Sequence, residues 1–117
     1  MFKLFVRAII KNEKGEILYV EKNENQKIAP GKSLLPGGSI EFSEIPEEAL
    51  KREVFEETGL EVIETKIFGT KTIIIGEEHW LGVYYTCKTK NLNFENKEPE
   101  KHKSVYFGDK KIFLEKF

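Results

Sequence analysis

Apolar and polar residues alternate along the start of the chain, with Lys3, Arg7 and two apolar residues on one side of an extended backbone. The other side carries only apolar residues: Phe2, Leu4, Val6, Ala8 and Ile10. This two-residue period predicts a strand. The segment 12–15 ends in a glycine and predicts a hairpin turn. The uninterrupted apolar run 17–20 then predicts a second strand that is buried on both faces.

The middle of the chain changes from a polar stretch to a helical pattern. Residues 21–32 predict a loop that leads to Leu-Leu-Pro-Gly-Gly at 34–38. Residues 43–58 predict the only long helix, with Pro46 tolerated in its first turn and Gly59 as the residue that ends it.

The last half of the chain is rich in β-branched and aromatic residues. It predicts long strands over 61–75 and 80–89 with a break at 76–79, then a polar loop over 90–103 and a short strand around 104–107. One helix among five strands predicts an α/β or α+β fold, a sandwich built on a mixed β-sheet. The length suits a single domain over residues 1–117.

Composition narrows the class of protein. With 39% hydrophobic and 33% charged residues, the chain is typical of a soluble globular protein. No apolar run approaches the ~20 residues of a membrane span, so we expect no membrane partner. A single cysteine, Cys87, excludes an internal disulfide and predicts a buried or half-buried thiol in a strand. A reducing, cytoplasmic location is the expectation.

Charge is distributed unevenly along the sequence. Residues 41–57 hold seven Glu and two basic residues, a net charge of −5, whereas the whole chain carries only −1. A double-stranded nucleic acid is therefore not the expected partner. On an α-helix Glu53, Glu56 and Glu57 share one face within about 100°. Like charges ~4 Å apart repel by about 1 kcal/mol in water and about 4 kcal/mol near a protein surface, so the cluster needs compensation.

Two kinds of compensation are available. Arg52 lies four residues after Glu48 and four before Glu56, which allows ion pairs that orient a carboxylate without neutralising the cluster. A hard divalent cation, Mg²⁺ or Mn²⁺, is the other candidate, because carboxylate oxygens are its preferred ligands. A solvated acidic helix face would show the same three-residue spacing, so that spacing alone does not decide between them.

A longer pattern decides in favour of the metal. Gly38, Glu44 and the run Arg52-Glu-Val-Phe-Glu-Glu-Thr-Gly-Leu60 match G-x5-E-x7-R-E-U-x-E-E-x-G-U at every specified position, with U aliphatic. The chain thus resembles the Nudix hydrolases. The resemblance implies an α/β/α sandwich with one catalytic loop-helix-loop. Ser33 departs from the family, in which an aromatic residue is usual two positions before Leu-Pro-Gly-Gly.

The resemblance implies metal-dependent hydrolysis of a nucleoside diphosphate linked to another group. It assigns metal binding to Glu53, Glu56 and Glu57, and makes one of them, or a residue of another loop, the base that deprotonates water. The carbonyl of Gly37 becomes a further ligand, and Gly38 lies against the substrate. Two more residues of the motif, Glu44 and Arg52, are expected to brace the loop and the helix.

Outside the motif the sequence gives weaker indications. Residues 98–101, Glu-Pro-Glu-Lys, resemble a run found in some Nudix nucleoside-triphosphate pyrophosphatases, although a charged surface loop is an equal alternative. The resemblance makes Glu98 or Glu100 an extra metal ligand and Lys101 a phosphate or base contact. Arg7 and His79 are further candidates for phosphate binding. The two histidines of the chain, His79 and His102, lack the paired spacing of a metal site.

The substrate expected is a small nucleotide, a nucleoside triphosphate cleaved to monophosphate and pyrophosphate. Relatives that act on ADP-ribose usually carry a proline about fifteen residues after the motif, and here no proline lies between Pro46 and Pro99. Those that act on dinucleoside polyphosphates usually carry a tyrosine near that place, where this chain has residues 74–76. A non-catalytic Nudix ligand sensor is the alternative from another class. The sequence leaves the oligomeric state open, a homodimer included.

Overall fold

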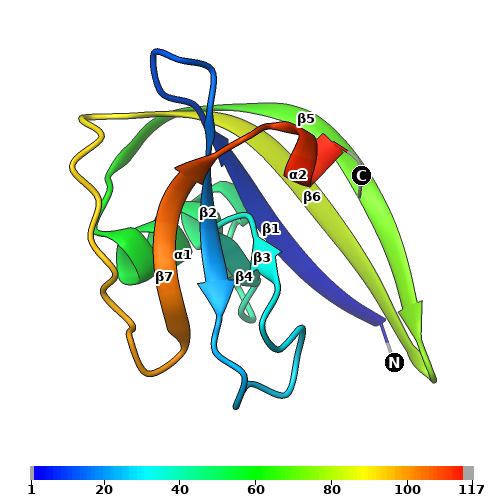
Figure 1. The fold of residues 1–117 in the computed structure, drawn as a ribbon. Helices are drawn as coiled ribbons and strands as arrows, with labels where there is room; N and C mark the ends of the chain where they lie inside the picture. Colours follow the sequence, from blue (N-terminus) through cyan, green and yellow to red (C-terminus); the bar gives the residue numbers. More distant parts are fainter. Residues whose placement is uncertain (1, 115–117) are drawn as a thin grey trace.

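The computed structural model describes residues 2–114, which form seven strands and two helices. Figure 1 shows them in chain order. The strands are β1 Phe2–Ile10, β2 Ile17–Lys22, β3 Ser33–Leu34, β4 Gly37–Ser39, β5 Val62–Ile75, β6 Glu78–Thr89 and β7 His102–Gly108. The helices are α1 Pro46–Thr58 and α2 Lys111–Leu114.

The strands form two sheets. The first is mixed, in the order β4-β1-β6-β5, because β1 and β6 run parallel while the other neighbours are antiparallel. The second is antiparallel, in the order β3-β2-β7. The predicted turn at 12–15 forms, but β1 and β2 are joined only by an isolated bridge between Lys11 and Ile17. The two strands then diverge, each into its own sheet.

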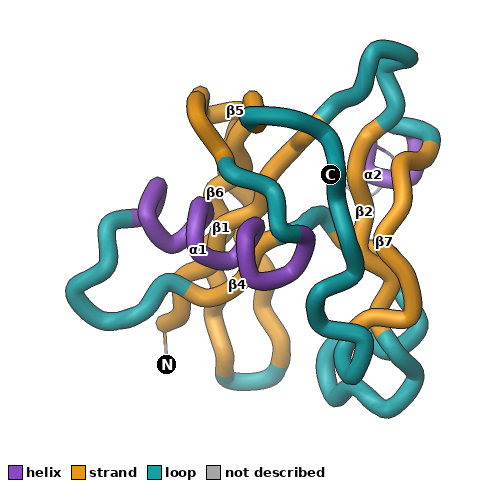
Figure 2. Tube along the Cα trace, turned by 90° about the vertical axis from the view of Figure 1, so that its left-hand side faces the viewer, coloured by secondary structure: helices purple, strands orange, loops and turns teal. Residues whose placement is uncertain are grey.

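Both faces of β1 and β2 are covered, which explains their apolar character. Val6, Ala8 and Leu18 pack with Leu50 and Val54 of α1 in one core, and the predicted double burial of 17–20 is confirmed. The alternate residues of the same strands pack in a second core with the C-terminal helix: Phe5, Ile9, Ile17, Tyr19 and Phe113. Figure 2 shows α1 and α2 on opposite sides of the strands. The predicted α/β/α sandwich is therefore confirmed.

The long helix starts later than predicted. It begins at Pro46 rather than at residue 43, because Ser43 has a φ of 68°, a left-handed backbone that no helix accommodates. Proline suits the first helical position, where its missing N–H costs nothing. The other end is as predicted: Gly59 has a φ of 75° and its N–H donates to the carbonyl of Phe55.

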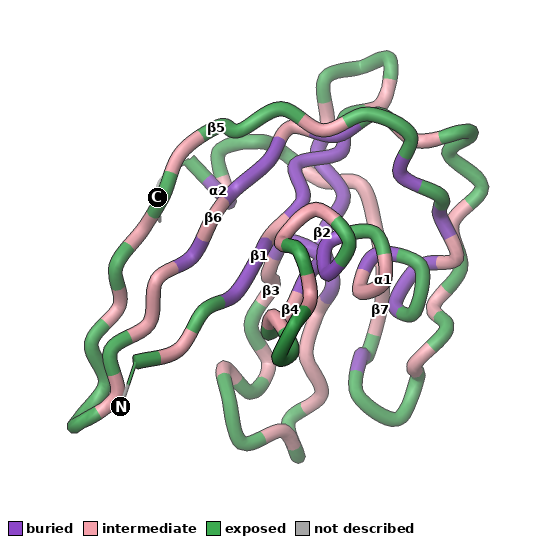
Figure 3. Tube along the Cα trace, turned by 180° about the vertical axis from the view of Figure 1, so that it is seen from behind, coloured by how far each residue is buried: buried purple, intermediate pink, exposed green. Residues whose placement is uncertain are grey.

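Strands β5 and β6 form a long hairpin whose turn is tighter than predicted. Strand β6 begins at Glu78, so the predicted break at 76–79 shrinks to Gly76 and Glu77. Figure 3 shows that β5, at the edge of the mixed sheet, is largely exposed while β1 is largely buried. Among residues 2–114, no helix is long and apolar enough to cross a membrane.

Candidate functional site

The Gly-Gly turn holds the end of α1 against the mixed sheet. Gly37 pairs with Arg7 of β1, and its N–H donates a 2.8 Å hydrogen bond to Oε1 of Glu57. Its φ of 150°, and the 2.0 Å that would separate an added Cβ from the carbonyl oxygen of Val6, both require glycine. An added Cβ on Gly38 would lie 2.6 Å from the carboxyl carbon of Glu53. The two glycines therefore let backbone and carboxylates meet.

Glu57 is the most deeply buried acid of the predicted set. It is 6% exposed, and burial raises the pKa of its carboxyl group to about 8. The hydrogen bond from Gly37 and the positive charge of Arg7 oppose this shift without cancelling it. A carboxyl group with so little compensation costs the fold free energy whenever it is ionised. This is the pattern expected where a cation or a proton completes the site.

Glu53 and Glu56 differ from Glu57 in their partners. Glu53 is partly buried, burial raises the pKa of its carboxyl group, and Nη1 of Arg52 donates to it at 2.9 Å. Glu56 is more exposed and lies 3.4 Å from the same Nη1. The charges of Glu53 and Glu57 act on each other. The predicted acidic face thus forms, with its most buried carboxylate at the C-terminal end of α1.

Arg52 and Glu44 brace the loop against the helix. Nε and Nη2 of Arg52 donate to the two oxygens of Glu44 at 2.7 and 3.0 Å, and Nη2 also donates to the carbonyl of Ser39 at 3.3 Å. These hydrogen bonds hold the pKa of the Glu44 carboxyl group near 2, well below its usual range. Such two-pronged pairs fix geometry as well as charge. The contacts agree with the bracing role predicted for both residues.

The loop before β7 and the first residue of that strand each add a group to the acidic face. Ligand atoms of Glu57, Glu98 and His102 all lie within 4.8 Å of one another. Nε2 of His102 is 3.5 Å from Oε2 of Glu57, and the N–H of His102 donates to the carbonyl of Glu98. Burial lowers the pKa of His102, which favours a neutral imidazole. The proximity of Glu98 supports the prediction made for it.

Sequence reasoning missed His102 because it sought a second histidine nearby, whereas the neighbours of His102 in space are acids. Only the length of the loop and the position of His102 at the start of a strand could have indicated that His102 lies beside these acids. The two other predicted residues of the loop lie further out: Glu100 is exposed, and Lys101 forms an ion pair with Glu98 at 3.3 Å.

Two basic residues of the strands face the acids. Arg7 donates to the carbonyl of Leu35 at 3.1 Å, and its charge interacts with Glu57 and Glu53. Lys22, which pairs with His102 across β2 and β7, interacts with Glu57 and Glu98. Burial lowers the pKa of both side chains. Arg7 thus lies near the acids and stays a candidate for phosphate binding, and Lys22 is a further candidate that was not identified within the polar stretch 21–32.

The other predicted phosphate contact lies elsewhere. His79 pairs with Phe2 at the start of β1, and the two rings are 5.0 Å apart. Arg7 is five residues further along β1, or roughly 16 Å at 3.3 Å per residue. The prediction for His79 is therefore corrected: the imidazole packs on Phe2, at the far end of the hairpin.

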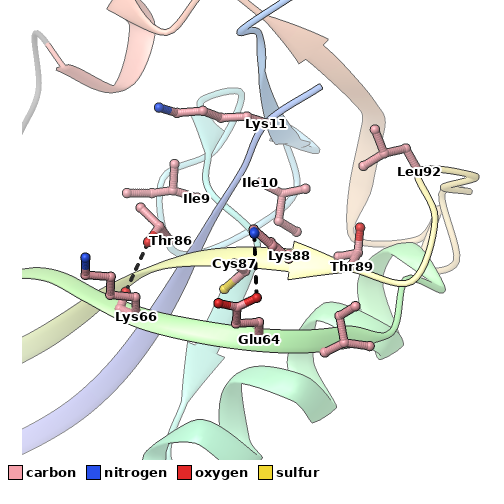
Figure 4. A pocket seen from close by; sticks show the side chains of 11 residues that line it. Ile9, Ile10, Lys11, Glu64, Lys66, Thr86, Cys87, Lys88, Thr89 and Leu92 are labelled. Carbon is pink, nitrogen blue, oxygen red and sulfur yellow. Dashed lines mark hydrogen bonds and ion pairs between the residues drawn. The ribbon is translucent and has the colours of Figure 1, made fainter. Parts of the chain in front are cut away.

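Two hollows lie near these elements. The larger, of about 650 Å³, is drawn in Figure 4, where Lys88 reaches Glu64 at 3.7 Å. None of the acids of α1 lines it. The smaller, of about 170 Å³, is lined by Arg7 and by Tyr19, Tyr84 and Phe113. Because Arg7 borders both the acids and this aromatic hollow, the smaller one belongs to the candidate site.

The donor set matches a divalent cation. Mg²⁺ and Mn²⁺ prefer carboxylate and carbonyl oxygens, and Glu53, Glu56, Glu57, Glu98 and the Gly37 carbonyl could supply them. The observation that tests this match is the burial of the Glu57 carboxyl group, which accepts from the N–H of Gly37 and lies beside ligand atoms of Glu98 and His102.

Comparison with known proteins agrees with this geometry. A model of the NUDIX domain matches residues 1–111. The chain belongs to the Nudix hydrolase family. It is similar to the MutT protein of Methanosarcina mazei Go1, with a TM-score of 0.86, 27% identity, and 97% of this chain and 81% of that one covered. It is also similar to a MutT NUDIX hydrolase from Burkholderia pseudomallei, with a TM-score of 0.83, 24% identity, and 92% of this chain and 82% of that one covered. This second likeness shows the fold alone.

Sequence relatives give a similar result. An RNA pyrophosphohydrolase of Hamiltonella defensa is 29% identical over 85% of this chain and 70% of its own length. An 8-oxo-dGTP diphosphatase of Haemophilus influenzae is 38% identical over 52% of this chain, a match that spans only 44% of that relative. As a Nudix hydrolase the protein acts on phosphoric anhydrides.

Proposed function

We propose that this Nudix hydrolase cleaves nucleoside triphosphates to the monophosphate and pyrophosphate with Mg²⁺ or Mn²⁺. The observation that carries the proposal is the placement of Arg7 between the acids of α1 and the small aromatic hollow. A nucleotide needs such a pair of neighbouring environments, because its phosphates are charged and its base is flat and apolar. Tyr84 and Phe113, which stack at 5.8 Å, give the hollow aromatic walls.

Each group of the chain has a distinct task in the proposed reaction. Water attacks one phosphorus, the bridging P–O bond breaks, and pyrophosphate leaves with the bond electrons. Arg7 and Lys22 bind phosphate oxygens and stabilise the charge that they gain. Glu53, Glu56, Glu57 or Glu98 takes the proton from the attacking water. Bound metal supplies charge neutralisation between the carboxylates and the phosphates.

The acids also disfavour a metal-free route. A triphosphate carries three or four negative charges, and each ionised carboxylate of the acidic face would repel it. The positive charges of Arg7 and Lys22 are too few to offset the negative charges of both the acids and the triphosphate. We therefore expect nucleotide binding itself, and not only turnover, to depend on the divalent ion.

The experiment is a panel of nucleotides incubated with Mg²⁺ and with Mn²⁺, with the products identified by mass. The panel includes ordinary nucleoside triphosphates, 8-oxo-dGTP, ADP-ribose, a dinucleoside polyphosphate and a 5′-triphosphorylated RNA. The last is included because the Hamiltonella defensa relative is named an RNA pyrophosphohydrolase. We expect monophosphate and pyrophosphate from at least one triphosphate.

Three results would contradict the proposal. Turnover of ADP-ribose or of a dinucleoside polyphosphate with inert triphosphates would move the protein to another Nudix substrate class. Cleavage confined to the RNA would make the mononucleotide assignment wrong. Binding of nucleotides without any turnover would favour the non-catalytic sensor, although the complete motif from Gly38 to Leu60 argues against it. A cytoplasmic location remains part of the proposal.

A further inference from the structure

His102 is the one imidazole among the described groups that meet the acids. Its side chain is 3% exposed, and Nε2 lies 3.5 Å from Oε2 of Glu57, whose side chain is 7% exposed. Glu98 brings a carboxylate into the same group, with all three ligand atoms within 4.8 Å. A buried histidine in contact with two acids is a different environment from a surface acidic patch.

The backbone at His102 is anchored, while one ring nitrogen has no protein partner. Nδ2 of Asn96 donates to the carbonyl of His102 at 2.8 Å. Among residues 2–114, two buried side-chain atoms have no hydrogen-bond partner, Nδ1 of His102 and Oδ1 of Asn96. Nε2 is the ring nitrogen that faces Glu57, 3.5 Å from its Oε2.

Nε2 of His102 and Oε2 of Glu57 need a proton or a cation between them, and the spacing of the group fits a cation. Two atoms bound at about 2.1 Å to one six-coordinate ion lie about 3 Å apart when adjacent and about 4.2 Å apart when opposite. The 3.5 Å separation and the 4.8 Å limit of the group are close to these values. Small side-chain movements therefore suffice for Glu57, Glu98 and His102 to share one ion.

The nature of the donor then affects which ion is favoured. Mg²⁺ prefers oxygen ligands, whereas imidazole nitrogen favours the later first-row transition metals. We propose that His102 Nε2 is a metal ligand beside Glu57 and Glu98, and that it gives this site a preference for first-row transition-metal ions such as Co²⁺ over Mg²⁺. The inference rests on the proposed metal-dependent function and deepens it.

The first test uses the unmodified protein and Co²⁺ alone. A histidine bound to Co²⁺ through Nε2 keeps a proton on Nδ1, so one ring N–H signal should appear far outside the normal proton NMR range in H₂O and vanish in D₂O. The chain has only two histidines, and His79 packs on Phe2 at the far end of the hairpin. The His79→Gln variant should therefore keep the shifted signal.

The second test exchanges the nitrogen for an oxygen. His102→Gln offers an amide oxygen at a similar reach, and we expect the ratio of Co²⁺ to Mg²⁺ affinity, measured by calorimetry, to fall by about tenfold or more. His79→Gln is the matched control and should leave the ratio unchanged. Because the NMR signal is recorded on the parent protein, the proposal is tested even if the His102 variant fails to fold.

The outcomes separate this inference from the proposed function. No exchangeable shifted signal, or an unchanged affinity ratio in folded His102→Gln, would overturn the role of His102 while Mg²⁺-dependent hydrolysis of triphosphates could still be observed. Conversely, a shifted signal in a protein that cleaves no triphosphate would support His102 as a ligand and contradict the proposed function.

Discussion

The two sides of α1 hold carboxyl groups in opposite states. On one side, Glu44 receives two hydrogen bonds from Arg52, which hold its pKa near 2. On the other, Glu57 is buried among the strands, and its pKa rises to about 8. The residue type is the same, so burial and partners make the difference. The Arg52 side is complete as it stands, whereas the Glu57 side needs a proton or a cation.

Within one sequence motif, this contrast separates residues that hold the loop and helix in place from residues placed for the reaction. The guanidinium of Arg52 meets Glu44 with two donors in a fixed geometry, so that pair fixes the loop before the helix. Among the described residues, Glu57 accepts a hydrogen bond from the N–H of Gly37 alone, with His102 at 3.5 Å and Arg7 acting through its charge. Glu57 is the carboxylate that the fold maintains at a cost.

The largest expected effect follows from removing that charge. Glu57→Gln keeps the side-chain shape and an oxygen that can accept from Gly37, so the variant in EDTA should be at least as stable as the parent. Turnover should fall by roughly two or more powers of ten, as loss of a group that stabilises transition-state charge commonly causes. Saturating Mg²⁺, which adds about 2.7 kcal/mol at 100 times its Kd, should stabilise the parent more. Thermal melts and a pyrophosphate-release assay measure these effects.

The control is Glu48→Gln, the same change on an exposed position of the same helix. It should leave turnover and the Mg²⁺ response unchanged. If Glu57→Gln melted lower than the parent in EDTA and kept turnover within a few-fold, Glu57 would be structural and the contrast between the two sides of α1 would fail.

The next effect is on the pH dependence of the metal-free protein. The folded state raises the pKa of Glu57 from 4.5 to about 8, so its contribution to stability is complete below pH 4.5 and is lost as the pH rises through 8. The slope approaches about 1.4 kcal/mol per pH unit. For Glu44 the sign is reversed: its contribution is present above pH 4.5 and is lost as the pH falls toward 2.

Denaturant titrations in EDTA at pH 5, 6, 7 and 8 measure the first of these slopes. The parent should lose stability across this range, and Glu57→Gln should lose much less. Equal slopes in the two proteins would mean that Glu57 is ionised in the folded state throughout. A parent that gains stability from pH 5 to 8 would contradict the assignment of the buried proton to this residue.

Local spacing predicted the Arg52 side of the helix well. The clustered acids Glu53, Glu56 and Glu57 lie with Arg52, Glu44 and the helix-ending Gly59 within residues 44–59. Over so short a segment, helical spacing largely relates one side chain to another. The start of the helix was wrong by three residues, because the left-handed backbone of Ser43 has no clear signal in a serine. The double burial of β2 also followed from apolar patterns, whereas the short strands β3 and β4 between β2 and α1 were not predicted.

Strand pairing, in contrast, placed the groups that sequence reasoning missed. Lys22 and His102 meet Glu57 because β2 pairs with β7, and this register depends on packing across the whole sheet. His79 failed for the same reason: its position near a strand start said nothing about which end of the sheet that start occupies. Long-range register, rather than residue chemistry, limited the prediction of the site.

The smallest expected effect comes from weakening the brace while keeping its charge. Arg52→Lys retains a cation near Glu44 but loses the two-pronged hydrogen bonds and the contact with the Ser39 carbonyl. We expect a loss of about 1 kcal/mol, or roughly 4 °C in melting temperature for a chain of this size. Turnover should fall by no more than about tenfold, because Arg52 positions Glu53 without replacing it.

Lys51→Arg, on the exposed neighbouring position, should change neither the melting temperature nor the turnover. If Arg52→Lys abolished turnover while its melting temperature stayed that of the parent, Arg52 would act on the substrate, and the two sides of α1 could no longer be divided into support and chemistry.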